Sequence, residues 1–113
     1  MKYLLLVFML FAQTALHAQT QLEMNMEAAA EAKKADAAMT ALYKKLMATL
    51  DEKGKQLLLE AQRAWIKYKE AHCKSVANAY DGGSMQPMVY SGCIADLTRA
   101  RSKELQEMLD DQH

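Results

Sequence analysis

The two cysteines constrain the fold of this chain more than any other feature. Cys73 and Cys93 lie at equal distances from Gly83, which belongs to the turn-forming run Asp81-Gly82-Gly83-Ser84. Glycine tolerates left-handed backbone, so this run ends one helix and lets the chain reverse. Two antiparallel helices joined there would bring the cysteines level with each other. The sequence therefore predicts a helical hairpin with a Cys73–Cys93 disulfide between its arms.

The N-terminus has the pattern of an export signal. A short basic start is followed by ten apolar residues, Tyr3 to Ala12, and by Ala18 at a suitable cleavage point. Such a run is too short to span a bilayer, which takes about 20 helical residues. We therefore predict a signal peptide over 1–18 and one domain over 19–113, periplasmic or secreted, with no membrane span after cleavage. The alternative is a buried N-terminal helix. An oxidising compartment outside the cytoplasm favours the disulfide.

Hydrophobic periodicity predicts three helices and no strands. The first covers 21–50 and is rich in good helix formers. The residues of its apolar face recur at spacings of three and four: Ala28, Ala32, Ala35, Met39, Leu42, Leu46 and Leu50. A break follows at 51–54, where Asp51 can cap the next helix. The fold class is therefore an all-α three-helix bundle with a long first helix and a disulfide-bonded hairpin of helices two and three.

The second and third helices have their own predicted faces. The second covers 55–80, and its expected buried stripe is Leu58, Ala61, Trp65, Tyr68, His72 and Val76, widened by Leu57, Ala64 and Ala71. The third starts at Ser84 as its N-cap, with Pro87 in its first turn, where proline is tolerated. Its apolar face is Met88, Cys93, Ile94, Leu97, Arg101, Leu105 and Met108. Arg101 falls near this face, where a charge needs a partner, so we expect pairing with Asp36 or Glu70 and stacking on Trp65.

Composition argues against several classes of function. The fourteen basic and fourteen acidic residues balance, and no basic run suggests a nucleic-acid partner. No nucleophile–base spacing, HExxH motif or phosphate-binding loop is present, so we predict no enzyme activity and no cofactor. The pairs Met24/Met26 and Met85/Met88 resemble thioether ligands for Cu(I), but no histidine cluster accompanies them. Methionine is also an ordinary filler of helical cores.

Several stretches together resemble the LprI-like family of bacterial envelope proteins, which is named after a lysozyme inhibitor. They are residues 20–25, Ala35-Asp36, Tyr43, the run AQRAWIKYKEAHC over 61–73, Gly82-Gly83-Ser84, Cys93, Thr98, Arg101 and Leu105. The resemblance covers almost the whole predicted domain. Two positions differ: Glu27 stands where members commonly have another cysteine, and Lys69 stands where many have arginine. Lysine keeps the charge but lacks the bidentate fork.

The resemblance implies lysozyme inhibition by protein–protein binding. The alternatives are a periplasmic binding or adaptor module for another envelope protein and, less favoured, a methionine-based copper carrier. The residues expected to build the core and the structural motif are Gln62, Trp65, Tyr68, Asp36, Tyr43, Arg101 and Leu105. The candidate interface is the hairpin turn and its flanks: Tyr80, Gly82, Gly83, Ser84, Met85 and Tyr90. Aromatic residues carry much of the binding energy of interfaces, and a helix start can also hold an anion.

Overall fold

A computed structural model describes the backbone of residues 2–112 and the side chains of residues 3, 15, 16 and 18–112. It contains three α-helices: α1 over Lys2–Thr49, α2 over Glu52–Ala77 and α3 over Gln86–Asp111. A short 3-10 turn, η1, covers Asn78–Tyr80 at the end of α2. No strand occurs among the described residues, so the predicted all-α fold is confirmed.

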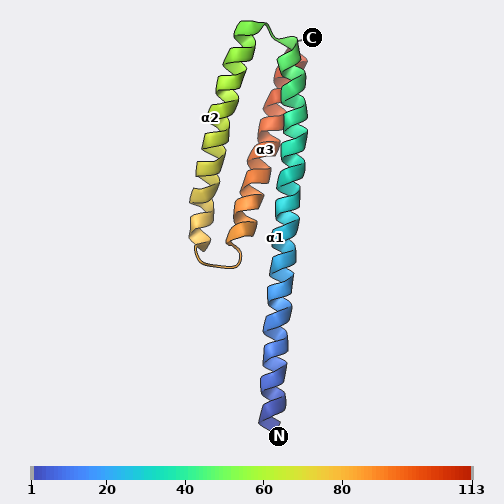
Figure 1. Ribbon diagram of the computed structural model, residues 1–113, viewed down its shortest axis with the longest axis vertical. Helices are drawn as coiled ribbons and strands as arrows, with labels where there is room; N and C mark the ends of the chain where they lie inside the picture. The colour runs from blue at the N-terminus through green and yellow to red at the C-terminus, as the bar shows by residue number, and fades with distance from the viewer. Residues whose placement is uncertain (1, 113) are drawn as a thin grey trace.

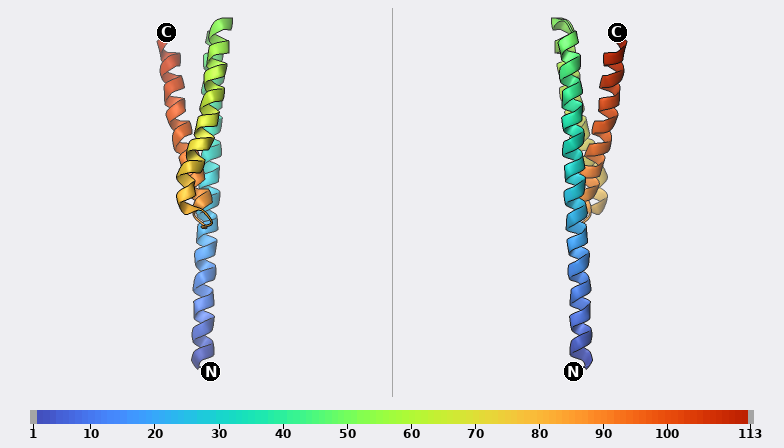
Figure 2. Two further views of the ribbon diagram at one scale, coloured as in Figure 1. Left: turned by 90° about the vertical axis from the view of Figure 1, so that its left-hand side faces the viewer. Right: turned by 90° about the vertical axis from the view of Figure 1, so that its right-hand side faces the viewer.

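The three helices form an elongated molecule, 78 Å in its longest dimension. Helices α2 and α3 run antiparallel as a hairpin, and α1 lies along the other side of α3 (Figure 1). The largest contact joins α1 to α3, whereas α1 and α2 touch little. The C-terminal end of α3 diverges from the other two helices (Figure 2). Helix α2 is therefore an outer element, held mainly through α3.

Helix α1 is longer than the sequence predicts. Its backbone is helical from Lys2, without a break near residue 18. It therefore continues well past the hairpin turn, and the N-terminus lies at the far end of the molecule (Figure 1). Within the described residues, none of the helices combines the length and apolar character that crossing a membrane requires. The signal peptide stays a prediction.

The core lies in the half of the bundle that is farther from the hairpin turn, where all three helices meet. Met39 and Leu46 of α1 pack with Leu58 of α2 and Leu105 of α3, and Leu46 and Leu105 are fully buried. The predicted apolar face of α1 is confirmed, because each of its seven residues is buried or half-buried. This cluster therefore holds the end of the bundle that lies opposite the hairpin turn.

The helix ends show which capping predictions hold. Asp51 has extended backbone and its side chain accepts a hydrogen bond from Gly54 N–H at 2.8 Å, so the predicted cap is confirmed and α2 starts at Glu52. Ser84 as the N-cap of α3 is wrong. The amide of Gln86 already bonds the carbonyl of Gly83, and Met85 has helical backbone without a side-chain cap. A tight turn thus leads directly into α3.

Candidate functional site

The disulfide joins the two arms of the hairpin as predicted. Cys73 and Cys93 are bonded, with their Cα atoms 5.5 Å apart. Cys73 is fully buried, while Cys93 is half-buried. The bond lies near the turn, so it limits the relative movement of the chain segments that enter and leave the turn.

The turn exposes most of the predicted interface residues. Tyr80 and Met85 are 44% and 41% exposed, and the backbone of Gly82 has a positive φ of 74° that favours glycine. Gly83 and Ser84 are also exposed. Tyr90 differs, because it lies half-buried in the first turns of α3. The accessible part of the predicted interface is therefore the segment that ends at Met85.

Helix α1 contributes to the same end of the hairpin, which the sequence did not predict. Asn25 Nδ2 donates to the Ser84 carbonyl at 3.1 Å, and Gln21 Nε2 lies 3.9 Å from Met88 Sδ. An open groove of about 680 Å³ runs between α1 and the turn, and its lining is Ala18, Thr20, Gln21, Leu22, Met24, Asn25, Gly83, Ser84 and Pro87. No spacing rule links residues so far apart in sequence, so only the folded packing reveals this groove.

The predicted buried stripe of α2 is wrong by about one residue. The stripe was expected to include Ala61, Tyr68, His72 and Val76, but all four are exposed. Leu58 is buried and Trp65 half-buried, as predicted, but the other buried residues are Gln62, Lys69, Cys73 and Ala77. The disulfide explains the difference, because Cys73 has to face α3 and the residues one turn away follow it inward. Tyr68, 56% exposed, stacks on His72 with ring centroids 5.4 Å apart.

Lys69 and Trp65 form a cation–π pair inside this stripe. Lys69 is only 8% exposed, and its Nζ lies 4.6 Å from the centroid of the Trp65 ring. Trp65 itself is half-buried against the core. No carboxylate lies within ion-pair distance of Lys69 among the described residues. The ring face therefore offers the ammonium its main favourable neighbour in a largely dehydrated place.

Arg101 is anchored by residues other than those predicted. Its Nε donates to Gln62 Oε1 at 3.1 Å, and its Nη1 donates to Glu104 Oε2 at 2.8 Å. The expected pairing with Asp36 or Glu70 is wrong. Gln62 is 6% exposed and also directs its amide nitrogen toward Met39 Sδ at 3.5 Å. One buried amide thus links all three helices.

Three of the residues that carry the family resemblance line one hollow between α1 and α2. Asp36, Tyr43 and Gln62 share it, although they are far apart in sequence. The hollow measures about 330 Å³, and its remaining lining is Met39, Thr40, Leu59, Arg63 and Ile66. Asp36 is exposed at its edge, so it does not belong to the core. Tyr43 is half-buried and packs against the core cluster.

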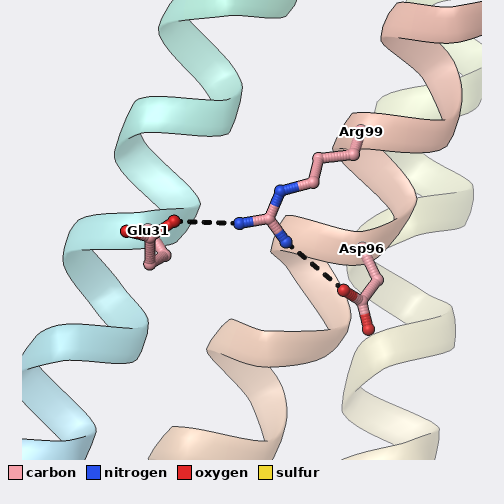
Figure 3. Close-up of polar contacts among 3 residues, drawn as sticks. All are labelled: Glu31, Asp96 and Arg99. Atoms are coloured by element: carbon pink, nitrogen blue, oxygen red, sulfur yellow. Dashed lines mark hydrogen bonds and ion pairs between the residues drawn. The ribbon is translucent and has the colours of Figure 1, made fainter.

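A surface ion pair links α1 to the middle of α3. Arg99 of α3 reaches Glu31 of α1 at 3.0 Å and Asp96 of its own helix at 3.4 Å (Figure 3). About half of the Arg99 side chain is exposed, so water screens both pairs. Such pairs contribute about 0–1 kcal/mol each and mainly define orientation.

Among the residues that the structure describes, no three His, Cys, Asp or Glu side chains are grouped closely enough to hold a metal ion. Of the methionine pairs considered for copper, Met24 and Met26 are exposed on α1 to different extents, 39% and 65%. The groups available for contact are aromatic rings, thioethers and amides, which are typical of surfaces that bind other proteins.

Comparison with known proteins identifies the family. Residues 12–105 match the family described as Lysozyme inhibitor LprI. The chain is also 35% identical over 106 residues to the uncharacterized protein R02472 of Rhizobium meliloti (strain 1021), an alignment that covers 82% of this chain and 76% of that protein. No solved structure matches it. The family match includes the hairpin, its disulfide and most of α1, so the chain belongs to the Lysozyme inhibitor LprI family.

Proposed function

We propose that this protein is exported and inhibits a lysozyme by binding to it. Membership of the Lysozyme inhibitor LprI family carries the proposal. An inhibitor needs an accessible, well-ordered surface rather than a set of catalytic groups, and the turn end of the hairpin offers such a surface. The second candidate is a binding or adaptor module for a different envelope protein, which would use the same kind of surface.

The hairpin turn is the surface that we propose for contact with lysozyme. Tyr80 and Met85 offer exposed aromatic and thioether area on either side of the two glycines. The Cys73–Cys93 bond and the Asn25–Ser84 hydrogen bond brace this segment. A braced loop loses little conformational entropy on binding, which favours affinity.

Charge adds a smaller contribution to this proposal. A lysozyme cleft contains two carboxyl groups that flank the bond to be cleaved. Lys74 lies exposed in the last turn of α2, on the approach to the turn, and would face such a cleft. Lys69 does not add to this charge, because it is buried over Trp65. Because the whole chain has a formal net charge of zero, long-range electrostatic steering of the two proteins toward each other would be weak.

The direct test is inhibition of cell-wall clearing. Purified protein is titrated into lysozymes of several types, including the host's own, while turbidity and binding are followed. Met85→Ala combined with Tyr80→Ala should weaken inhibition by about thirtyfold if the pair forms a hot spot worth about 2 kcal/mol. Met108→Ala is the matched control, because Met108 is 40% exposed on α3 but lies near its opposite end. It should leave inhibition unchanged.

Each outcome distinguishes the candidates. Inhibition that is lost only in the turn variant supports both target and surface. Inhibition that survives the turn variant keeps lysozyme as the target and removes this surface. Absence of binding and inhibition with every lysozyme contradicts the proposal and favours the adaptor. Export is tested separately: protein recovered from the periplasm of an expression host should have the mass of a chain that begins at Gln19.

A further inference from the structure

One side of α2 carries a continuous uncharged stripe whose residues are all exposed. Its six residues alternate at spacings of four and three: Leu57, Ala61, Ala64, Tyr68, Ala71 and Ser75. All six are exposed, and the two large ones, Leu57 and Tyr68, are 52% and 56% exposed. The stripe lies beside the face that α2 packs against α3, and its first two residues, Leu57 and Ala61, also line an open hollow next to Met108 of α3. We call this stripe the outer seam.

The spacing of the outer seam is that of a helix-pairing surface. Apolar or small residues that alternate at four and three return to one side of a helix every 3.5 residues on average, as in coiled coils. Alanine and serine at four of the six positions let a second helix approach closely. A helix that served only as a solvated outer face would be expected to place charged residues on this side.

We propose that the outer seam is covered by a second copy of this chain, with the two α2 helices antiparallel about a two-fold axis. A two-fold contact must be complementary to itself. The register centred near residue 66 meets this condition, because each large residue faces a small one. Leu57 lies opposite the partner's Ser75, Ala61 opposite the partner's Ala71, and Ala64 opposite the partner's Tyr68. The two-fold axis repeats each contact.

Charges beside the seam support the same register. Glu60, Lys67 and Lys74 lie seven residues apart along one edge of the seam, and all are exposed. The register places Glu60 beside the partner's Lys74, and symmetry makes this ion pair twice. The single like pair, Lys67 beside the partner's Lys67, lies at the axis, where long side chains can turn into solvent.

Registers shifted by one heptad fit less well. One shift opposes Leu57 to the partner's Tyr68, two large residues, and leaves alanine facing alanine in the neighbouring layer. The other shift places Lys67 beside the partner's Lys74, and symmetry repeats this repulsion. The proposed contact uses residues 57–75 of α2 and no residue of the hairpin turn, so it does not depend on the proposed function.

The first test is the oligomeric state of the full protein as recovered after export. Sedimentation equilibrium over a wide concentration range should show a monomer–dimer equilibrium. Ala64→Glu places a charge inside the seam and should raise the dimer dissociation constant by at least about tenfold. Ala37→Glu is the control, because Ala37 is exposed on the outward face of α1 and the substitution is chemically the same. It should leave the equilibrium unchanged, and helicity by circular dichroism should match for all three proteins.

Charge reversal tests the arrangement. Glu60→Lys and Lys74→Glu should each weaken the dimer, and the double variant should restore it, because the swapped charges again pair across the axis. A wild-type protein that stays monomeric at the highest concentration overturns the proposal. So does a dimer that Ala64→Glu leaves intact. Failure of the double variant to recover overturns the antiparallel register. Association with a different protein through the seam by a monomeric chain would also overturn it.

Discussion

The contact between Gln62 and Arg101 allows a stability measurement whose size follows from the structure. The Arg101 side chain is 11% exposed, and its Nε–H donates to Gln62 Oε1 at 3.1 Å. Gln62→Leu keeps a side chain of similar size but removes the acceptor. The guanidinium then loses a buried partner and retains only Glu104, whose side chain is 60% exposed.

The expected cost of Gln62→Leu is about 2 kcal/mol. A hydrogen bond to a charged group contributes about 1.5–3 kcal/mol, and a buried donor left without an acceptor loses its full solvation. Extra apolar burial by leucine offsets part of this loss. Arg101→Leu should cost a comparable amount, because it leaves Gln62 Oε1 without its donor. The double variant removes both partners and should be more stable than the sum of the two single losses predicts.

A double-mutant cycle by urea denaturation measures this difference. Wild type, both single variants and the double variant should give a coupling energy of about 1–2 kcal/mol between positions 62 and 101. Glu104→Gln is the control, because a half-exposed pair within one helix should contribute less than about 1 kcal/mol. Additive losses, with a coupling energy near zero, would show that Gln62 and Arg101 stabilise the fold independently and would refute the reasoning.

Three further substitutions test other parts of the fold by the same denaturation assay. Replacing Cys73 and Cys93 by alanine should lower the free energy of unfolding by about 2–5 kcal/mol, and an unchanged midpoint would contradict a stabilising bond. Thr98→Val should raise stability by about 1 kcal/mol, because the buried Thr98 hydroxyl has no hydrogen-bond partner among the described residues; a loss would mean that the hydroxyl is bonded. Trp65→Ala should lower the free energy of unfolding by about 2–3 kcal/mol. Tyr68→Ala, measured in dilute monomeric protein, should lower it by less than about 0.5 kcal/mol. The reverse order would show that Tyr68 is in the core, as hydrophobic periodicity predicted.

The fold was predictable from the sequence because its main determinants are local. Small and apolar residues at spacings of three and four define the inner face of α1, and the symmetry of Cys73 and Cys93 about Gly83 defines the hairpin. Asp51 marks the start of α2 through its side-chain hydrogen bond with Gly54, a residue only three positions further along the chain. Each of these signals depends on spacing along one helix or turn, which a sequence displays directly.

The candidate surfaces were less predictable, because α2 presents two stripes of similar apolar character. Hydrophobicity alone favoured the one that contains Tyr68, but the buried one contains Gln62 and Lys69. Burial of these polar residues is compensated by Arg101 and by the Trp65 ring, contacts that only tertiary packing supplies. The contact of Asn25 with Ser84 is likewise non-local. The position of Cys73 was the available signal, since a bonded cysteine must face its partner.

The hydrogen bond between Asn25 and Ser84 has a practical consequence for handling this protein. It places the start of the domain that we predict, near Gln19, only a few residues from the hairpin turn. An affinity tag or fluorophore at that N-terminus would lie beside the surface proposed to bind lysozyme. The C-terminal end lies at the opposite end of the bundle (Figure 1). Labels, tethers for surface-based binding measurements and fusion partners therefore belong at the C-terminus, away from that surface.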